Sequence, residues 1–106
     1  MRLKSDIFVA ALVRRAAVEG AYAVIARRGA EEAGAIFVKV NALDGTAAFY
    51  GPAPQMAFDE AFPTDRKFIE IVPAGTPESE ADGRIAREVR FDPDIFVVEI
   101  EDRQGR

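Results

Sequence analysis

The sequence contains no histidine, no cysteine and no tryptophan in its 106 residues. Without histidine, it lacks the commonest general base near neutral pH and the commonest metal ligand. Without cysteine, it has neither a thiol nucleophile nor a disulfide. The aspartate, glutamate, lysine, arginine, tyrosine, serine and threonine side chains that remain form no recognisable catalytic pattern. We therefore expect no catalytic activity, no metal site and no cofactor.

A long hydrophobic run is also missing, since no stretch approaches the roughly 18 apolar residues that a membrane-spanning helix needs. The basic start and the apolar stretch Ile7–Val13 are typical of the beginning of a signal peptide, but Arg14 and Arg15 interrupt that stretch at once. We therefore expect a cytoplasmic protein with no membrane association.

The overall composition is that of a folded domain, with 49% hydrophobic and 30% charged residues. A chain of 106 residues fits one domain and buries a modest core without disulfides. No repeat, low-complexity segment or interdomain linker divides it. We expect a single domain over residues 1–106, with a polar tail from about residue 101.

The net charge of −4 is unevenly distributed. Residues 1–28 hold six basic and two acidic side chains, whereas residues 29–106 hold the other eight basic and sixteen acidic ones. An acidic protein is a poor ligand for phosphate backbones, so a nucleic-acid partner is not expected. A protein partner, self-association or a small anionic ligand at the basic N-terminal segment stays compatible with this distribution.

The first predicted helix begins with Ser5 as its cap and ends at Gly20. Its core-facing residues recur at helical spacing, and they are Val9, Leu12, Val13 and Ala16. Ile7, Ala11 and Val18 fall on the side that carries the arginines, so the helix is apolar nearly all round. Such a helix needs cover on more than one side.

Five strands are predicted from β-branched and aromatic residues, at 21–27, 35–40, 46–50, 67–72 and 95–100. Asp44 and Gly45 predict a two-residue hairpin between the second and third strands. A second helix is expected to start at Thr76 as cap with Pro77 in the first turn, and to end at Asp92. Its apolar stripe consists of Ala81, Ile85 and Val89.

The predicted element order is α-β-β-β-β-α-β, with short connections that favour antiparallel neighbours. We therefore expect an α+β domain in which an antiparallel sheet of about five strands carries both helices on one face. The other face is then open to water or to a partner.

Four segments together carry a resemblance to a known family: Arg2–Ile7, Arg27–Ile36, Tyr50–Pro54 and Asp92–Glu101. The chain resembles a family of short bacterial proteins known as domain of unknown function 1491, and the likeness covers nearly its whole length. The resemblance implies a bacterial single-domain protein. It implies no activity, cofactor or catalytic residue.

The arginines of the N-terminal third form the first candidate site, and they are Arg14, Arg15, Arg27 and Arg28. Guanidinium groups pair well with carboxylates and phosphates, so this set is a candidate contact for an anion or an acidic partner. Charged runs are usually solvated faces, and the acidic residues at 31 and 32 offer alternative partners.

The second candidate site is the loop after the third predicted strand, with contact residues Gly51, Pro52, Pro54, Met56 and Phe58. Two prolines stiffen such a loop and reduce the entropy lost on binding. Methionine and phenylalanine are favoured at contact surfaces. The alternative is that Met56, Phe58 and Phe62 pack under the loop as a satellite core.

Acidic residues suggest two further alternatives that the pattern favours less. Those at 31, 32, 59, 60 and 65 lack the spacing of a calcium loop, so we interpret them as solubilising. Asp65-Arg66-Lys67 matches a three-residue fragment of metal-dependent nucleases, for which Asp44 is a candidate second acid. Asp44 is better explained by its turn.

The sequence thus favours a small non-catalytic interaction module, with a homodimer as one form of it. The alternative is an enzyme or regulatory domain that binds a small anionic ligand through Arg14, Arg15, Arg27 and Arg28.

Overall fold

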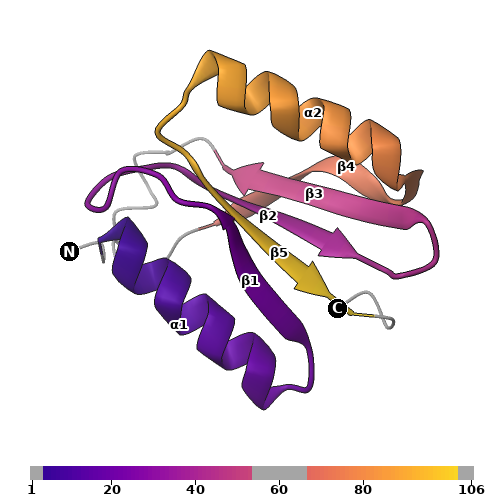
Figure 1. Ribbon diagram of the computed structural model, residues 1–106, viewed down its shortest axis with the longest axis horizontal. Helices are drawn as coiled ribbons and strands as arrows, with labels where there is room; N and C mark the ends of the chain where they lie inside the picture. Colours follow the sequence, from indigo (N-terminus) through magenta and orange to yellow (C-terminus); the bar gives the residue numbers. More distant parts are fainter. Residues whose placement is uncertain (1–3, 54–66, 103–106) are drawn as a thin grey trace.

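The computed structural model describes residues 4–53 and 67–102 (Figure 1). Its elements are α1 (Ser5–Val18), β1 (Tyr22–Arg27), β2 (Ile36–Asn41), β3 (Thr46–Pro52), β4 (Phe68–Pro77), α2 (Glu78–Phe91) and β5 (Phe96–Glu101). This confirms the α+β class and the order α-β-β-β-β-α-β.

The five strands form one mixed sheet in the order β1-β5-β2-β3-β4. β5 is parallel to β2, and every other neighbouring pair is antiparallel. The expectation of a purely antiparallel sheet is therefore wrong. The last strand enters the middle of the sheet after α2 and separates β1 from β2, because its apolar residues 95–98 are buried on both faces.

The two helices lie on opposite faces of the sheet (Figure 1), so the expectation that both cover one face is also wrong. The helices lie on opposite faces because successive side chains of β2 point to opposite faces of the sheet and are apolar on both. Ile36 packs in a core with Val9 of α1, whereas Phe37 packs in a core with Ala81 of α2. A central strand with apolar residues on both sides needs a helix on each.

Each helix covers only part of its face, since α1 lies over β1 and β5 and α2 lies over β3 and β4. Within the described residues, part of the expected open sheet face is found at β1, beyond the reach of α2. There Tyr22 is 63% exposed and Val24 is 41% exposed.

Of the two predicted ends of α1, the C-terminal one is confirmed and the N-terminal cap is wrong. Ser5 does not cap the helix, because its hydroxyl is buried and donates to the carbonyl oxygen of Gly34 at 2.6 Å. At the other end Gly20 adopts φ +86°, and its N–H donates to the carbonyl oxygen of Ala17. The N–H of Ala21 donates to the carbonyl oxygen of Ala16, which completes a Schellman motif.

The start of α2 also differs from the sequence-based prediction, because the expected capping residue does not cap the helix. Thr76 does not cap it, because its hydroxyl donates to the carbonyl oxygen of Pro73 at 2.7 Å. The helix begins at Glu78, directly after Pro77. β4 continues to Pro77, past its expected end at residue 72.

The β2–β3 hairpin has a connection over residues 42–45, longer than the expected two-residue turn. Leu43 adopts φ +64° there, and Gly45 adopts φ +92°. The hydroxyl and the N–H of Thr46 donate to Oδ1 of Asp44 at 2.6 and 3.0 Å. These two hydrogen bonds hold the pKa of Asp44 below its ordinary value.

Candidate functional site

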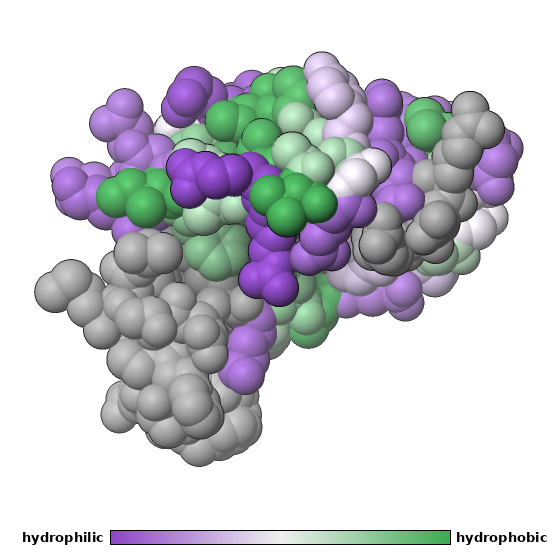
Figure 2. Space-filling view, turned by 90° about the horizontal axis from the view of Figure 1, so that it is seen from below, coloured by the Kyte–Doolittle hydropathy of each residue, from purple (hydrophilic) through white to green (hydrophobic). Residues whose placement is uncertain are grey.

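The outer face of α1 points away from the sheet and is unusually apolar. Val18 is 81% exposed and Ile7 is 50% exposed, although both are large hydrophobic residues. We define the outer face by the exposed residues Ile7, Ala10, Ala11, Arg14 and Val18. Figure 2 shows this side of the molecule, where green apolar groups lie among purple hydrophilic ones. The face has no cover within the described residues.

A groove runs along this face, and we call it the α1 groove. Its lining residues are Asp6, Ile7, Ala10, Ala11, Arg14, Arg28 and Glu31. It therefore carries two acidic and two basic side chains around an apolar strip. No ion pair within 4.0 Å joins these four charges in the described part of the chain. Both signs thus remain available to an incoming surface, through the exposed Arg14, Arg28 and Glu31, while Oδ1 of Asp6 is buried.

The other two predicted arginines have local partners. Nε of Arg15 lies 3.2 Å from Oε2 of Glu19. Nη2 of Arg27 donates to the carbonyl oxygen of Pro93 at 2.7 Å, while its Nε is buried and has no hydrogen-bond partner among the described residues. The structure therefore brings Arg14 and Arg28 to one groove and places the other two arginines elsewhere, so the four do not surround one anion.

The second predicted site is described only in part. Gly51 is buried, and a Cβ placed there would lie 2.6 Å from Cδ1 of Ile71 and 2.8 Å from Cε2 of Phe37. Its lack of a side chain therefore serves the packing of the core. Pro52 is exposed at the end of β3. The remaining predicted contacts, Pro54, Met56 and Phe58, lie outside the described residues, as do Asp59, Glu60, Asp65 and Arg66.

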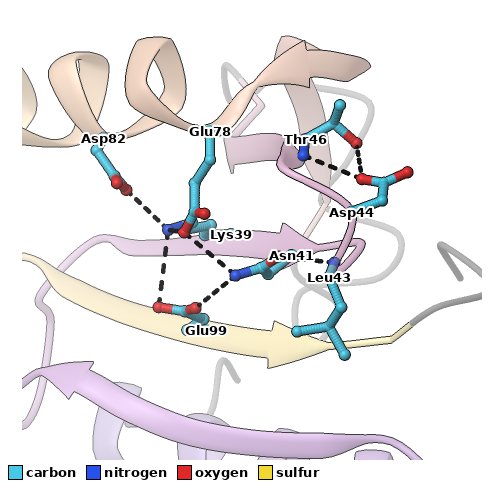
Figure 3. Close-up of polar contacts among 8 residues, drawn as sticks. All are labelled: Lys39, Asn41, Leu43, Asp44, Thr46, Glu78, Asp82 and Glu99. Carbon is cyan, nitrogen blue, oxygen red and sulfur yellow. Dashed lines mark hydrogen bonds and ion pairs between the residues drawn. The ribbon is translucent and has the colours of Figure 1, made fainter.

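A buried lysine forms a charged cluster that the sequence analysis did not identify (Figure 3). The side chain of Lys39 is only 6% exposed. Its Nζ donates to Oε2 of Glu78 and to Oδ1 of Asp82, each at 2.7 Å. Oε1 of Glu99 lies 3.9 Å away. One ammonium group thus joins the central strands β2 and β5 to the first turns of α2.

Asn41 completes this cluster from the same strand as Lys39 (Figure 3). Its Nδ2 donates to Oε2 of Glu78 at 3.2 Å and to Oε2 of Glu99 at 3.3 Å. Its Oδ1 accepts a hydrogen bond of 2.8 Å from the N–H of Leu43. The side-chain amide of Asn41 therefore bridges the carboxylates of Glu78 and Glu99, and it also holds the first residues of the β2–β3 connection.

The charge state of Lys39 decides what this cluster can do. Burial lowers the pKa of Lys39, but the hydrogen bonds to Asp82 and Glu78 and the field of Glu99 raise it by more. The net effect places the pKa above its ordinary value of 10.5. An amine that is protonated at neutral pH is neither a nucleophile nor a general base there. The cluster is therefore equipped to hold α2 against the sheet.

One sequence signal pointed toward Lys39, since it alternates with Phe37 on one side of β2 and interrupts an apolar strand. Its partners Glu78 and Asp82 are four residues apart and share a helix face. Nothing local to either segment shows that the two lie together.

The described residues contain neither a metal-binding cluster nor a membrane-spanning helix. Within residues 4–53 and 67–102, no group of three or more acidic side chains is placed to hold a metal ion. In the same ranges, no helix has the length and apolar character that crossing a membrane requires.

Comparison with solved structures reveals close likenesses to this chain. A protein of A. tumefaciens, solved in solution, is 47% identical with a TM-score of 0.82, over 95% of this chain and 86% of that one. A crystal structure of a DUF1491 family protein from Caulobacter crescentus is 45% identical with a TM-score of 0.80, over 100% of this chain and 91% of that one. An NMR structure of a DUF1491 family protein from the same organism is 44% identical, with a TM-score of 0.79 and the same coverage.

A comparison with curated proteins finds no match. The family model for DUF1491, described as a protein of unknown function, matches residues 3–106. Together with structural relatives of 44–45% identity that bear the same family name, this match confirms the resemblance seen in the sequence. The chain belongs to the DUF1491 family.

Proposed function

We propose that this protein is a non-catalytic interaction module that associates with a second copy of itself through the outer face of α1. The observation that carries the proposal is the exposure of Ile7 and Val18, at 50% and 81%, on a helix whose opposite stripe already packs on the sheet. Covering apolar surface is favourable by about 25 cal/mol per Å². The outer face of α1 therefore gains free energy from a partner.

The charges of the α1 groove support a second copy as that partner. A two-fold interface uses the same patch on both copies, so the patch must complement itself. The α1 groove does so, because it holds Asp6 and Glu31 together with Arg14 and Arg28. A groove lined by one sign of charge would repel its copy.

The order of these residues along the helix favours an antiparallel arrangement. Asp6 lies in the first turn of α1, whereas Arg14 lies in its second half. When two α1 helices cross near Ala10 and Ala11, Asp6 of each copy approaches Arg14 of the other. Small side chains at the crossing allow the helix axes to approach closely, and antiparallel helix dipoles attract.

Sedimentation equilibrium over a range of protein concentrations tests the proposal. The unmodified protein is expected to dimerise, and Ile7→Asp with Val18→Asp is expected to yield a monomer whose circular dichroism and melting temperature are retained. Leu43→Asp is the matched control, because it makes the same kind of change at a side chain that is 47% exposed on the far β2–β3 connection. A monomeric unmodified protein at millimolar concentration would overturn the proposal.

A charge-reversal experiment tests the arrangement itself. Arg14→Glu makes the α1 groove predominantly acidic, and Asp6→Lys makes it predominantly basic. Each variant alone is expected to stay monomeric, while an equimolar mixture forms a heterodimer. If the two variants fail to associate when mixed, the α1 groove is not the interface.

A further inference from the structure

A second groove lies on the other side of the molecule, between α2 and the edge strand β4. Its volume of about 810 Å³ falls in the range of ligand-binding sites. We call it the α2–β4 groove and define it by Ile71 and Pro73 of β4 and by Glu80, Gly83, Arg84, Arg87 and Arg90 of α2, so one acidic side chain lines it beside three basic ones. No residue of the α1 groove contributes to it.

A β-bulge provides the apolar floor of this groove. Phe49 pairs with Val72 and Tyr50 pairs with Glu70, so Ile71 is an extra residue in β4. Consequently Ile71 and Val72 both pack toward the core under α2, where regular alternation would turn one of them away. The bulge thus widens the apolar surface beside the helix.

The helix wall of the groove contains a glycine that the fold does not require. Gly83 lies inside α2, where glycine costs about 1 kcal/mol relative to alanine. A Cβ placed on Gly83 would have no atom within 4 Å, and its backbone is not in the left-handed region. Neither close packing nor backbone conformation explains the glycine. Its absence of a side chain keeps the groove open.

The rim of the groove is basic toward the end of α2. Arg84, Arg87 and Arg90 follow one another at three-residue intervals, which places them along one side of the helix. Arg84 is neutralised by Glu88, whose Oε2 lies 2.9 Å from its Nε. Within the described residues, Arg87 and Arg90 enter no ion pair. These two guanidinium groups are therefore available for an anionic partner.

An aromatic side chain adjoins these two arginines. Phe91 is 89% exposed, the largest exposed fraction among the large hydrophobic residues described. It lines an adjoining hollow together with Arg87, Glu88 and Arg90. Aromatic and arginine side chains are the residues that most often dominate binding energy at protein interfaces.

We propose that the α2–β4 groove binds an acidic peptide segment of a partner protein. Carboxylates of the segment pair with Arg87 and Arg90, for which the planar guanidinium fork is well suited. Apolar side chains of the segment pack on Ile71 and in the space left by Gly83. Pro73 has no N–H to offer from the strand edge, so side chains of the groove, and not sheet extension, provide the recognition.

The short basic rim of the groove favours a peptide over a nucleic acid. The net charge of −4 opposes every anionic partner, so the choice between them depends on the extent of the rim. Two unpaired guanidinium groups beside an apolar floor match a short segment of mixed acidic and apolar residues. A phosphate backbone would need a longer basic track.

The test is an NMR titration of the isotope-labelled full chain with a synthetic decapeptide in which glutamate and leucine alternate. At millimolar peptide, the backbone amides of α2 and β4 are expected to shift. Arg87→Gln with Arg90→Gln is expected to weaken binding by at least about tenfold. Arg15→Gln with Lys67→Gln also removes two positive charges, from exposed side chains outside both grooves, and serves as the matched control that leaves binding unchanged.

The variant Gly83→Leu distinguishes loss of binding through a blocked groove from loss of binding through unfolding. The leucine side chain projects into open space, so the amide spectrum outside α2 and β4 stays unchanged while peptide binding is lost. Gly83→Ala adds only a methyl group and is expected to retain most of the affinity.

Three results would overturn the proposal. They are the absence of shifts in α2 and β4, equal affinity for the decapeptide with lysine in place of glutamate, and tighter binding of oligothymidine at the same amides. None of them bears on self-association, because the α1 groove shares no residue with the α2–β4 groove.

Discussion

Nζ of Lys39 lies 2.7 Å from Oδ1 of Asp82, and this contact joins the middle of the sheet to the second turn of α2. The lysine side chain is 6% exposed, whereas the carboxylate is 55% exposed. The pair therefore lies at the boundary between core and solvent. Its cation is buried and its anions are partly hydrated, so the loss of the cation and the loss of one anion have unequal costs.

Replacement of Lys39 measures the cost of losing the buried cation. Lys39→Met keeps the length of the side chain but leaves Glu78, Asp82 and Glu99 to repel one another, so we expect the free energy of unfolding to fall by about 2 kcal/mol. Urea denaturation measures the change. The control is Arg15→Met, which removes a surface pair whose side chains are 79% and 50% exposed and should cost less than about 0.5 kcal/mol.

The pH dependence of stability follows from the same group. Because folding raises the pKa of Lys39 above 10.5, the stabilisation is complete below that pH and is lost as the pH rises through the folded pKa. We expect the unmodified protein to lose more stability than Lys39→Met above about pH 10.5. Thermal unfolding of both proteins across this range provides the comparison. Parallel stability curves would contradict the expectation.

Local patterns in the sequence predicted the elements well, and they failed for the sheet order. Gly20 ends α1 as expected, because its left-handed backbone depends only on neighbouring residues. The pairing of Ile36 with Phe96 joins segments that are distant in the chain, and no local periodicity encodes it. The continuous apolar run at residues 95–98 is a pattern typical of a central parallel strand, but the expectation of an antiparallel sheet took no account of it.

One candidate site could be recognised from local sequence patterns, and the other could not. The apolar outer face of α1 was visible in the sequence, because Ile7, Ala11 and Val18 fall opposite the core-facing stripe of one helix. The α2–β4 groove was not visible, because it exists only where α2 folds back along β4. A glycine inside a helix weakens it, and this can be read from the sequence at Gly83, but the open space beside Gly83 is a property of the fold.

The positive φ of Leu43 offers a stabilising change. A left-handed conformation costs a residue with a Cβ roughly 1–2 kcal/mol, and asparagine tolerates it better than leucine does. Leu43 is 47% exposed, so little packing is lost when it is replaced. We expect Leu43→Asn to raise the free energy of unfolding by about 1 kcal/mol, measured by urea denaturation. A decrease would show that the leucine side chain contributes more than the backbone strain costs.

Two glycines lead to opposite expectations for the same substitution. A methyl group at Gly51 would approach Cδ1 of Ile71 to 2.6 Å, so Gly51→Ala overpacks the core and should cost about 1–3 kcal/mol. A methyl group at Gly83 meets nothing within 4 Å, so Gly83→Ala should stabilise the helix by about 1 kcal/mol. Thermal unfolding of the two variants measures both effects in one assay. A loss of stability in Gly83→Ala would mean that the fold itself requires this glycine, and the argument that it serves to keep the α2–β4 groove open would fail.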